Sequence, residues 1–354
     1  MEKLFMTGNE AIAEAAVRAG CRYYFGYPIT PQNEIPEYMV KRLPEVGGVF
    51  LQAESEIASI FMVYGAAGSG ARVMTSSASP GISLKQEGIS YIAAAELPCV
   101  IVNMMRGGPG LGGIQPSQSD YFQATKGGGH GDYHLFVLAP ATVQEAADLC
   151  LEAFDIADRY RNPVMILGDG VLGQMMEPVS FQDRRPAADL PEKTWALTGT
   201  KGRAANVVKT LNLDPSVLEK HNLKLQEKYK RMAKEEVRVE CYQVDDAEIV
   251  IAAYGTVARI AKTAIQALRE KGIKAGLVRP ITLYPFPYKT FADIAPKVRK
   301  ILTVEMSLGQ MVEDVRLAVG DKTEVCFFGR CGGIVPGYEE IVVEVEKLTA
   351  KVAR

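Results

Sequence analysis

This 354-residue sequence lacks any apolar run of the roughly 20 residues that a membrane-spanning helix needs. It also lacks a positively charged start followed by an apolar core, the pattern of a secretory signal. A basic excess is missing too, since the formal net charge is −2, and this argues against nucleic-acid or membrane-surface partners. We therefore expect a cytoplasmic protein that binds neither nucleic acid nor membrane.

Clustered cysteines are absent as well. The six cysteines are scattered without a Cys-x-x-Cys pair, so they cannot form a local zinc knuckle or the ligand set of an iron–sulfur centre. We expect reduced, mostly buried thiols. Cys331 lies in a Gly-Arg-Cys-Gly-Gly stretch, which a glycine-rich turn is enough to explain.

Strands and helices alternate along the first 170 residues. We expect strands at 22–26, 49–52, 72–75, 100–104, 135–138 and 164–167, and helices at 9–19, 32–43, 55–70, 84–95 and 143–159. Near-continuous apolar strands joined by helices predict a parallel sheet with helices on both faces. The class is α/β.

Three units are predicted, covering residues 1–180, 181–245 and 246–354. The middle unit is a connector with a charged helix at 215–236, a kind of helix that more often braces domains or partners than carries chemistry. The last unit is a smaller α/β domain with strands at 248–253, 274–278, 300–304 and 324–328, and with helices at 257–271 and from 339 onward.

A proline-bracketed threonine follows the first of these strands, in Tyr-Pro-Ile-Thr-Pro at 27–31. Pro28 and Pro31 fix their own φ and restrict the preceding residues, so the Thr30 hydroxyl should be presented from a stiff turn. That turn lies at the carboxyl end of a strand, where open α/β sheets bind ligands. The alternative is a proline-stabilised loop without chemistry.

A carboxylate opens the helix expected at 55–70. Ser55 suits the N-cap, and Glu56 lies in the first turn, where the helix dipole favours negative charge. Glu54 and Glu56 could simply be solvated charges. However, the following residues are largely apolar and predict a buried helix, so that Glu56 would face a pocket or an interface, suited to exchange a proton with a heterocycle.

Two further segments carry polar groups at strand ends. Residues 75–81 form a hydroxyl-rich turn that contains Ser76 and Ser77. Arg106 stands where an apolar strand gives way to a glycine-rich loop, a place from which a guanidinium can bind a carboxylate through two parallel hydrogen bonds. Alternatively, Arg106 pairs with an acid nearby.

Together these segments resemble the alpha, pyrimidine-binding subunit of the 2-oxoacid:ferredoxin oxidoreductases, which use thiamine diphosphate. The resemblance is carried by 27–31, by Ser-Glu at 55–56 before an alanine- and glycine-rich helix, by 75–81, by Arg-Gly-Gly-Pro at 106–109 and by Gln-Ser-Asp at 118–120. It extends over nearly the whole chain. It implies a thiamine-diphosphate-binding fold, with a pyrimidine domain followed by a domain like the transketolase carboxyl-terminal domain.

The resemblance also implies roles for residues. Glu56 falls where a glutamate contacts the aminopyrimidine ring, and Thr30 and Arg106 fall where family members bind the 2-oxoacid. Three catalytic residues are therefore expected, Glu56, Thr30 and Arg106. Further cofactor-binding groups are expected at Pro28, Ile29, Ser76 and Ser77.

Half of the cofactor site is missing from the sequence. Family members hold magnesium and the diphosphate with Gly-Asp-Gly followed some thirty residues later by asparagine. Gly-Asp-Gly occurs at 168–170, but the next asparagine is Asn206, so we interpret 168–170 as a turn and expect no metal site. The resemblance assigns the diphosphate, Mg²⁺ and [4Fe-4S] clusters to partner subunits: a beta (diphosphate-binding) subunit, a gamma subunit and a ferredoxin-like delta subunit.

The implied reaction is oxidative decarboxylation of a 2-oxoacid to acyl-CoA and CO₂, with coenzyme A as cosubstrate and ferredoxin as electron acceptor. Residues 27–36 and the short amino terminus look most like the branched-chain members, which act on 3-methyl-2-oxobutanoate. A 2-oxoglutarate type and then a pyruvate type are the alternatives. A self-sufficient thiamine decarboxylase or transketolase needs the complete metal motif. A non-catalytic scaffold predicts that Glu56, Thr30 and Arg106 do not converge.

Overall fold

The largest layer of the protein is a seven-stranded sheet. A computed structural model describes residues 3–181 and 190–350. In the order β12-β6-β7-β5-β4-β2-β3, every neighbouring pair is parallel except β12 with β6. The strands are β2 (Tyr23–Gly26), β3 (Val49–Gln52), β4 (Val73–Ser77), β5 (Cys99–Met105), β6 (Phe136–Leu138), β7 (Pro163–Asp169) and β12 (Thr282–Tyr284). All the strands predicted before residue 170 are confirmed, whereas β12 was not predicted.

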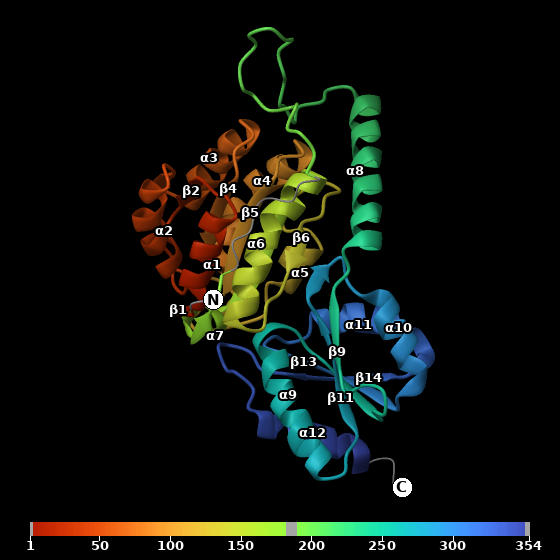
Figure 1. The fold of residues 1–354 in the computed structure, drawn as a ribbon. Coiled ribbons are helices and arrows are strands. Elements are labelled where there is room, and N and C mark those ends of the chain that lie inside the picture. Colours follow the sequence, from red (N-terminus) through yellow and green to blue (C-terminus); the bar gives the residue numbers. More distant parts are fainter. Residues whose placement is uncertain (1–2, 182–189, 351–354) are drawn as a thin grey trace.

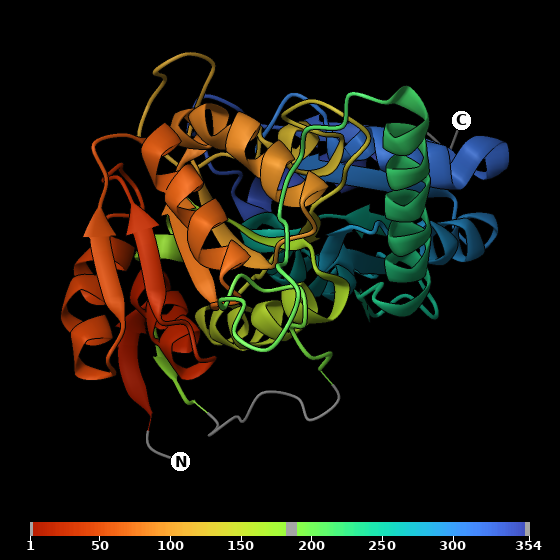
Figure 2. The ribbon, with the colours of Figure 1, turned by 90° about the horizontal axis from the view of Figure 1, so that it is seen from above.

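Helices cover both faces of this sheet, as the sequence predicts. α1 packs against α2 and α6 on one face, and α3 packs against α4 on the other (Figure 2). The helices of this part are α1 (Gly8–Arg18), α2 (Glu34–Glu45), α3 (Glu56–Gly68), α4 (Ser79–Ala94), α5 (Tyr121–Thr125), α6 (Val143–Tyr160) and α7 (Gly170–Gln174). A short antiparallel ribbon of β1 (Leu4–Thr7) and β8 (Met176–Val179) flanks α1.

A second, five-stranded sheet follows in the chain and lies beside the first (Figure 1). Its order is β14-β13-β10-β11-β9, parallel except for β9. The strands are β9 (Val239–Tyr242), β10 (Ile249–Ala252), β11 (Ala275–Pro280), β13 (Lys300–Glu305) and β14 (Glu324–Gly329). The helices are α9 (Gly255–Glu270), α10 (Tyr288–Ile294), α11 (Met311–Val319) and α12 (Tyr338–Ala350), and two 3₁₀ turns are Ala295–Lys297 and Gly320–Lys322. The four predicted strands of this part are confirmed.

The charged helix is α8 (Pro215–Glu235), which stands against the first part of the chain (Figure 1). Its buried residues are Leu225, Tyr229 and Met232. Lys224 and Lys228 on α8 both pair with Glu96, which follows α4. The helix therefore braces the first sheet's helical layer before the chain enters β9. The beginning of the predicted connector falls partly on residues 182–189, outside the described residues.

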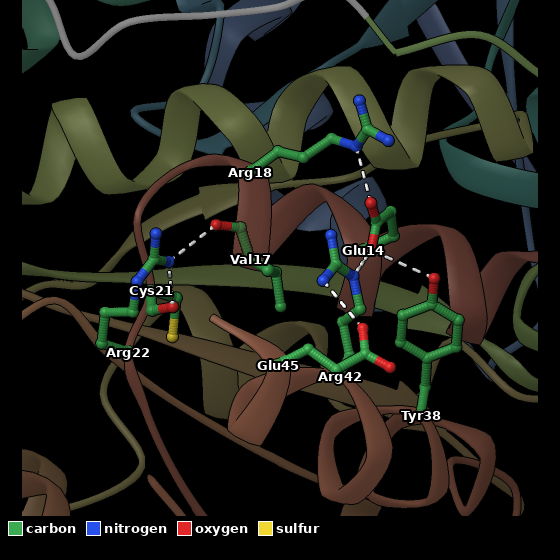
Figure 3. A network of polar contacts seen from close by, with 8 residues as sticks. All are labelled: Glu14, Val17, Arg18, Cys21, Arg22, Tyr38, Arg42 and Glu45. Carbon is green, nitrogen blue, oxygen red and sulfur yellow. Dashed lines mark hydrogen bonds and ion pairs between the residues drawn. The ribbon is translucent and has the colours of Figure 1, made fainter. Parts of the chain in front are cut away.

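A buried carboxylate fixes α2 against α1. Glu14 on α1 is 3% exposed and accepts hydrogen bonds from Arg18 Nε at 2.7 Å, Arg42 Nε at 3.0 Å and Tyr38 Oη at 3.0 Å (Figure 3). Buried charges are stable only when they are paired in this way. Because α2 begins directly after the Thr30 turn, this network holds the segment that carries the turn.

Three of the six cysteines, Cys21, Cys99 and Cys150, are buried, and burial raises the pKa of each thiol. Cys241 and Cys331 are exposed, so the expectation of mostly buried thiols holds for only half of them. Among the described residues, no helix is both long enough and apolar enough to cross a membrane.

Candidate active site

The predicted site residues lie at one edge of the seven-stranded sheet. Because β2, β4 and β5 are parallel neighbours, the turn after Gly26, residue Ser77 and the loop after Met105 leave the sheet on the same side. Ser77 pairs with Asn103 across these strands. The location matches the carboxyl edge at which open α/β sheets bind ligands.

Two amide side chains hold the Thr30 turn through the carbonyl of Pro31. The carbonyl of Pro31 accepts hydrogen bonds from Asn9 Nδ2 at 2.8 Å and from Gln174 Nε2 at 3.1 Å. Asn9 is fully buried in α1, so one end of the turn is fixed to the core. Thr30 itself is exposed, as is Pro28, whereas Ile29 is partly buried. The turn thus presents Thr30 outward, as its two prolines predict.

Arg106 joins that turn to the glycine-rich loop. Its Nη1 donates to the Thr30 carbonyl and its Nη2 donates to the Leu111 carbonyl, each at 3.0 Å. Arg106 is 6% exposed, and its Nε is buried without a partner among the described residues. The acid partner that we considered as an alternative is not observed in the described part of the chain. Arg106 therefore keeps an unused donor while its other nitrogens are held by main-chain oxygens.

Glu56 is the first residue of α3. Ser55 is the N-cap, and its Oγ accepts a hydrogen bond from the Ala58 amide at 3.2 Å, which confirms the predicted cap. Glu56 is 7% exposed, although no described group donates a hydrogen bond to its carboxylate. The carboxylate lies over Gly81, where an added Cβ would be 2.8 Å from Oε1. Only glycine at 81 leaves room for this position.

The two predicted serines differ in whether their hydroxyls are still free to form a hydrogen bond. Ser76 Oγ contacts Tyr24 Oη at 2.6 Å and donates to Gln32 Oε1, so it belongs to an interior network. Ser77 Oγ is buried without a partner among the described residues. It also lies against Gly81, since a Cβ there would be 2.1 Å away. Ser77 therefore retains hydrogen-bonding capacity that Ser76 has already used.

The β4–α4 turn connects these groups. Ser77 and Gly81 lie beside the Glu56 carboxylate, and Ser79 Oγ bonds the main chain of Arg106, accepting from its amide at 3.1 Å and donating to its carbonyl at 3.2 Å. Arg106 in turn holds Thr30. The Arg106 main chain is thus joined to Ser79 and its guanidinium to the Thr30 carbonyl, while the Glu56 carboxylate lies beside Gly81 of the same turn.

Sequence reasoning missed a buried lysine beside this turn. Lys85 on α4 is 0% exposed, and its Nζ donates to Ser59 Oγ at 2.8 Å and Thr75 Oγ1 at 2.5 Å. A signal was present, because Lys85 lies three residues after Ile82 and four before Ile89, both buried on the same helix face. The helical period therefore places this cation on the inner face.

Two cavities flank the Arg106 loop. One, of about 480 Å³, is lined by residues that include Thr30, Ile114 and Gln115, and the other, of about 470 Å³, by residues that include Ser79, Asp120 and Leu308. Glu56 lines neither cavity. Instead, α3 exposes Ile57 (45%) and Phe61 (36%), and α4 exposes Leu84 (50%). The prediction of a fully buried α3 was wrong, because one apolar side of this helix faces outward.

Two groups beside Gly81 suit hydrogen bonding to a heterocyclic ring. Glu56 offers an acceptor without a described donor, Ser77 offers a buried hydroxyl without a described partner, and both pack closely on Gly81. Asp169, by contrast, ends β7 and caps α7 by accepting hydrogen bonds from the amides of Val171 at 2.9 Å and Leu172 at 3.1 Å, so residues 168–170 join a strand directly to a helix and are not the predicted turn. Among residues 3–181 and 190–350, no three His, Cys, Asp or Glu side chains gather as metal ligands.

This two-sheet architecture is that of the thiamine diphosphate-binding fold, a pyrimidine-type domain followed by a domain of the transketolase carboxyl-terminal type. A structure of a split-gene transketolase, an inactive beta4 tetramer, aligns over 97% of each chain with a TM-score of 0.61 and 14% identity, a likeness of fold alone. The chain belongs to the pyruvate flavodoxin/ferredoxin oxidoreductase family, whose thiamine diphosphate-binding region matches residues 14–254 and whose core domain II matches residues 247–341.

Relatives of known name lie within the same family. Ketoisovalerate oxidoreductase subunit VorB of Methanothermobacter thermautotrophicus is 50% identical over 98% of both chains. The 2-oxoglutarate synthase subunit KorA of the same organism is 36% identical over 98% of this chain and 99% of its own. The 2-oxoglutarate:ferredoxin oxidoreductase of Magnetococcus marinus superposes with a TM-score of 0.88 at 28% identity, and our chain covers 65% of that chain's length. The resemblance seen in the sequence is thereby confirmed.

Proposed function

We propose that this chain is the alpha subunit of a 2-oxoacid:ferredoxin oxidoreductase that acts on 3-methyl-2-oxobutanoate. The observation that carries the proposal is the 50% identity, over 98% of both chains, with a ketoisovalerate oxidoreductase subunit. The reaction would convert the oxoacid and coenzyme A into acyl-CoA and CO₂ and deliver electrons to ferredoxin. Thiamine diphosphate, when bound, supplies the electron sink for decarboxylation.

In this proposal the chain's own residues bind and orient. Glu56 would accept a hydrogen bond from the bound pyrimidine ring and hold the proton that the ring gives up, and Ser77, Pro28 and Ile29 would line the ring. Arg106 would bind the oxoacid carboxylate, and the exposed Thr30 would donate to an oxoacid oxygen. The contacts that join Arg106 to Thr30 and to Ser79, on the turn beside the Glu56 carboxylate, support the assignment. Ser76 acts through the Tyr24 and Gln32 network.

A partner subunit completes the site. The diphosphate, Mg²⁺ and the [4Fe-4S] clusters would lie on the beta and ferredoxin-like delta subunits, with a gamma subunit as a further partner. Two observations support the division: Asp169 is already used to cap α7, and α3 and α4, the helices that carry Glu56 and Gly81, expose the apolar residues Ile57, Phe61 and Leu84. A partner that covers those side chains would also enclose the Glu56 carboxylate.

The chain is further proposed to divide at residues 180/181 and 245/246. The two separate sheets favour a division of this kind. However, β12 returns from the last unit to the first sheet, and β9, at residues 239–242 of the connector, belongs to the second sheet. A cytoplasmic location stays a prediction from the sequence.

A 2-oxoglutarate-type specificity is the competing proposal, because KorA is 36% identical. A dicarboxylate would need a second cation in the site. The described residues that line the two cavities beside Arg106 include neither lysine nor arginine, and Ile114 adds an apolar side chain. These surroundings favour a substrate with one carboxylate and an aliphatic tail.

Substrate preference tests the proposal. The chain assembled with its native partners should reduce a viologen dye with kcat/KM for 3-methyl-2-oxobutanoate at least about 10-fold above that for 2-oxoglutarate, since an unpaired second carboxylate costs binding energy in a site without a second cation. Pyruvate serves as a small control substrate. A higher kcat/KM for 2-oxoglutarate would move the chain to the competing class.

A further inference from the structure

Lys85 is an uncommon group for a protein interior. It is 0% exposed and sits between α4, α3 and β4, and its hydrogen-bond acceptors are two hydroxyls and, at 3.5 Å, the Ser76 carbonyl. No carboxylate accepts directly from its Nζ in the described part of the chain. A buried ammonium without an ion pair is costly, so its retention calls for a physical reason.

The surroundings connect Lys85 to Glu56 along both helices. On α4, Gly81 and Lys85 are four residues apart on one face, and Gly81 is the residue over which the Glu56 carboxylate lies. On α3, Ser59 follows Glu56 by one turn, donates to the Glu56 carbonyl at 2.8 Å and accepts from Lys85. The cation thus lies one helical turn beyond the carboxylate, bound through a side chain that is itself tied to Glu56.

We propose that Lys85 is a positioning residue for Glu56: its buried positive charge holds the Glu56 carboxylate in place beside Gly81 and Ser77. The expected effect of Lys85 on turnover rests on the proposed function of Glu56. The interaction between the two charges does not rest on it, because that interaction exists in the folded chain whether or not the chain is catalytic. In a water-poor interior two opposite charges one helical turn apart interact strongly even without direct contact.

The charges facing Lys85 are few. Glu56 on α3 is the acidic side chain that acts on it, and the Cys99 thiol on β5 is the other titratable group, while Ser59 and Thr75 contribute neutral hydroxyls. Burial lowers the pKa of Lys85 to about 7, and the charge of Glu56 opposes this decrease. Between about pH 7 and 10.5, the ordinary pKa of lysine that applies in the unfolded chain, Lys85 is protonated in the unfolded chain but not in the folded chain. In that window the contribution of Lys85 to the free energy of unfolding rises with pH.

A double-mutant cycle on the full chain tests the contact without any assay of activity. At pH 6, where Lys85 is charged, Glu56→Gln should lower Tm by about 2–6 °C in the parent chain and by much less in a Lys85→Met background. At pH 9, where Lys85 is neutral, the effects of Glu56→Gln and Lys85→Met should add. Lys85→Gln retains a donor for Ser59 and Thr75 without the charge, so it should behave like Lys85→Met.

Lys228 offers a matched control, because only 8% of its side chain is exposed and desolvation lowers its pKa to about 8, but its acidic neighbour is Glu96. Lys228→Met should be additive with Glu56→Gln at both pH values. In the assembled enzyme, Lys85→Met should lower kcat about 10-fold below pH 7, where Lys85 is charged, with little change in kcat at pH 9 and little change in KM.

An additive cycle at pH 6 overturns the inference, even if Glu56→Gln abolishes turnover. Conversely, if the two substitutions are coupled at pH 6 but Glu56→Gln keeps full activity, the interaction between Lys85 and Glu56 is supported and the proposed function of Glu56 is overturned. The two failures are therefore distinguishable.

Discussion

Glu56→Gln in the assembled oxidoreductase is expected to lower kcat by about 10²–10⁴-fold, the range over which a positioned acid or base contributes to catalysis. Glutamine matches the shape of glutamate but cannot exchange the proton. Because the described residues donate no hydrogen bond to this carboxylate, the loss should fall on the chemistry and leave KM for the oxoacid nearly unchanged. Dye reduction at saturating oxoacid and thiamine diphosphate measures the effect.

Glu54→Gln is the matched control, since Glu54 lies two residues earlier and is exposed. It should retain nearly full activity, and an equal loss in both variants would refute the assignment of Glu56.

Two glycine variants test whether the position of the Glu56 carboxylate matters when its charge is unchanged. In Gly81→Ala the new methyl group would press on Glu56 and Ser77, whereas in Gly88→Ala it would press on Ile60 at 2.4 Å. Overpacking should cost both chains about 1–3 kcal/mol of stability, but only Gly81→Ala should lose most of its activity.

Arg106→Ala is expected to lower kcat/KM for the oxoacid by about 10²–10³-fold, with KM raised and kcat lowered together. The substitution removes the proposed carboxylate ligand and also releases the Thr30 turn from the glycine-rich loop, because both carbonyl contacts are lost. Arg106→Lys should recover little, since one ammonium cannot reproduce a planar group that reaches two separate segments. Steady-state kinetics over a range of oxoacid concentrations gives both constants.

Arg22 provides the control for Arg106. Its Nη1 also donates to two carbonyls, those of Val17 at 3.0 Å and Cys21 at 2.8 Å, but it lies just before β2, at the strand end opposite the Thr30 turn (Figure 3). Arg22→Ala should therefore lose stability without a specific loss in kcat/KM. Unchanged kinetics in Arg106→Ala would refute its role at the substrate.

The features that follow from local sequence were predictable. Ser55 caps α3 because a hydroxyl before an apolar run satisfies a free amide, and the apolar runs mark the strands. The edge strand β12 was not predictable, because its three residues pair with a strand that precedes them by more than a hundred positions. The carbonyl partners of Arg106 depend equally on which strands become neighbours.

The outward face of α3 shows a different limit. Ile57 and Phe61 are as apolar as core residues, so composition cannot tell a buried face from one that a partner covers. Lys85 was hidden because lysines are rarely fully buried, although its place in the helical period pointed inward. Both features concern how Glu56 is enclosed, which is the part of the site least evident from the sequence.

We propose that this chain contributes one half of a thiamine site shared with a partner subunit. Viologen reduction by the purified chain alone, compared with the same chain assembled with its partner subunits, tests it most directly, with thiamine diphosphate, Mg²⁺, coenzyme A and 3-methyl-2-oxobutanoate present in both. We predict no turnover by the isolated chain and thiamine-dependent turnover by the assembly. Sustained turnover by the isolated chain would show that it holds a complete thiamine site and that no partner subunit is needed.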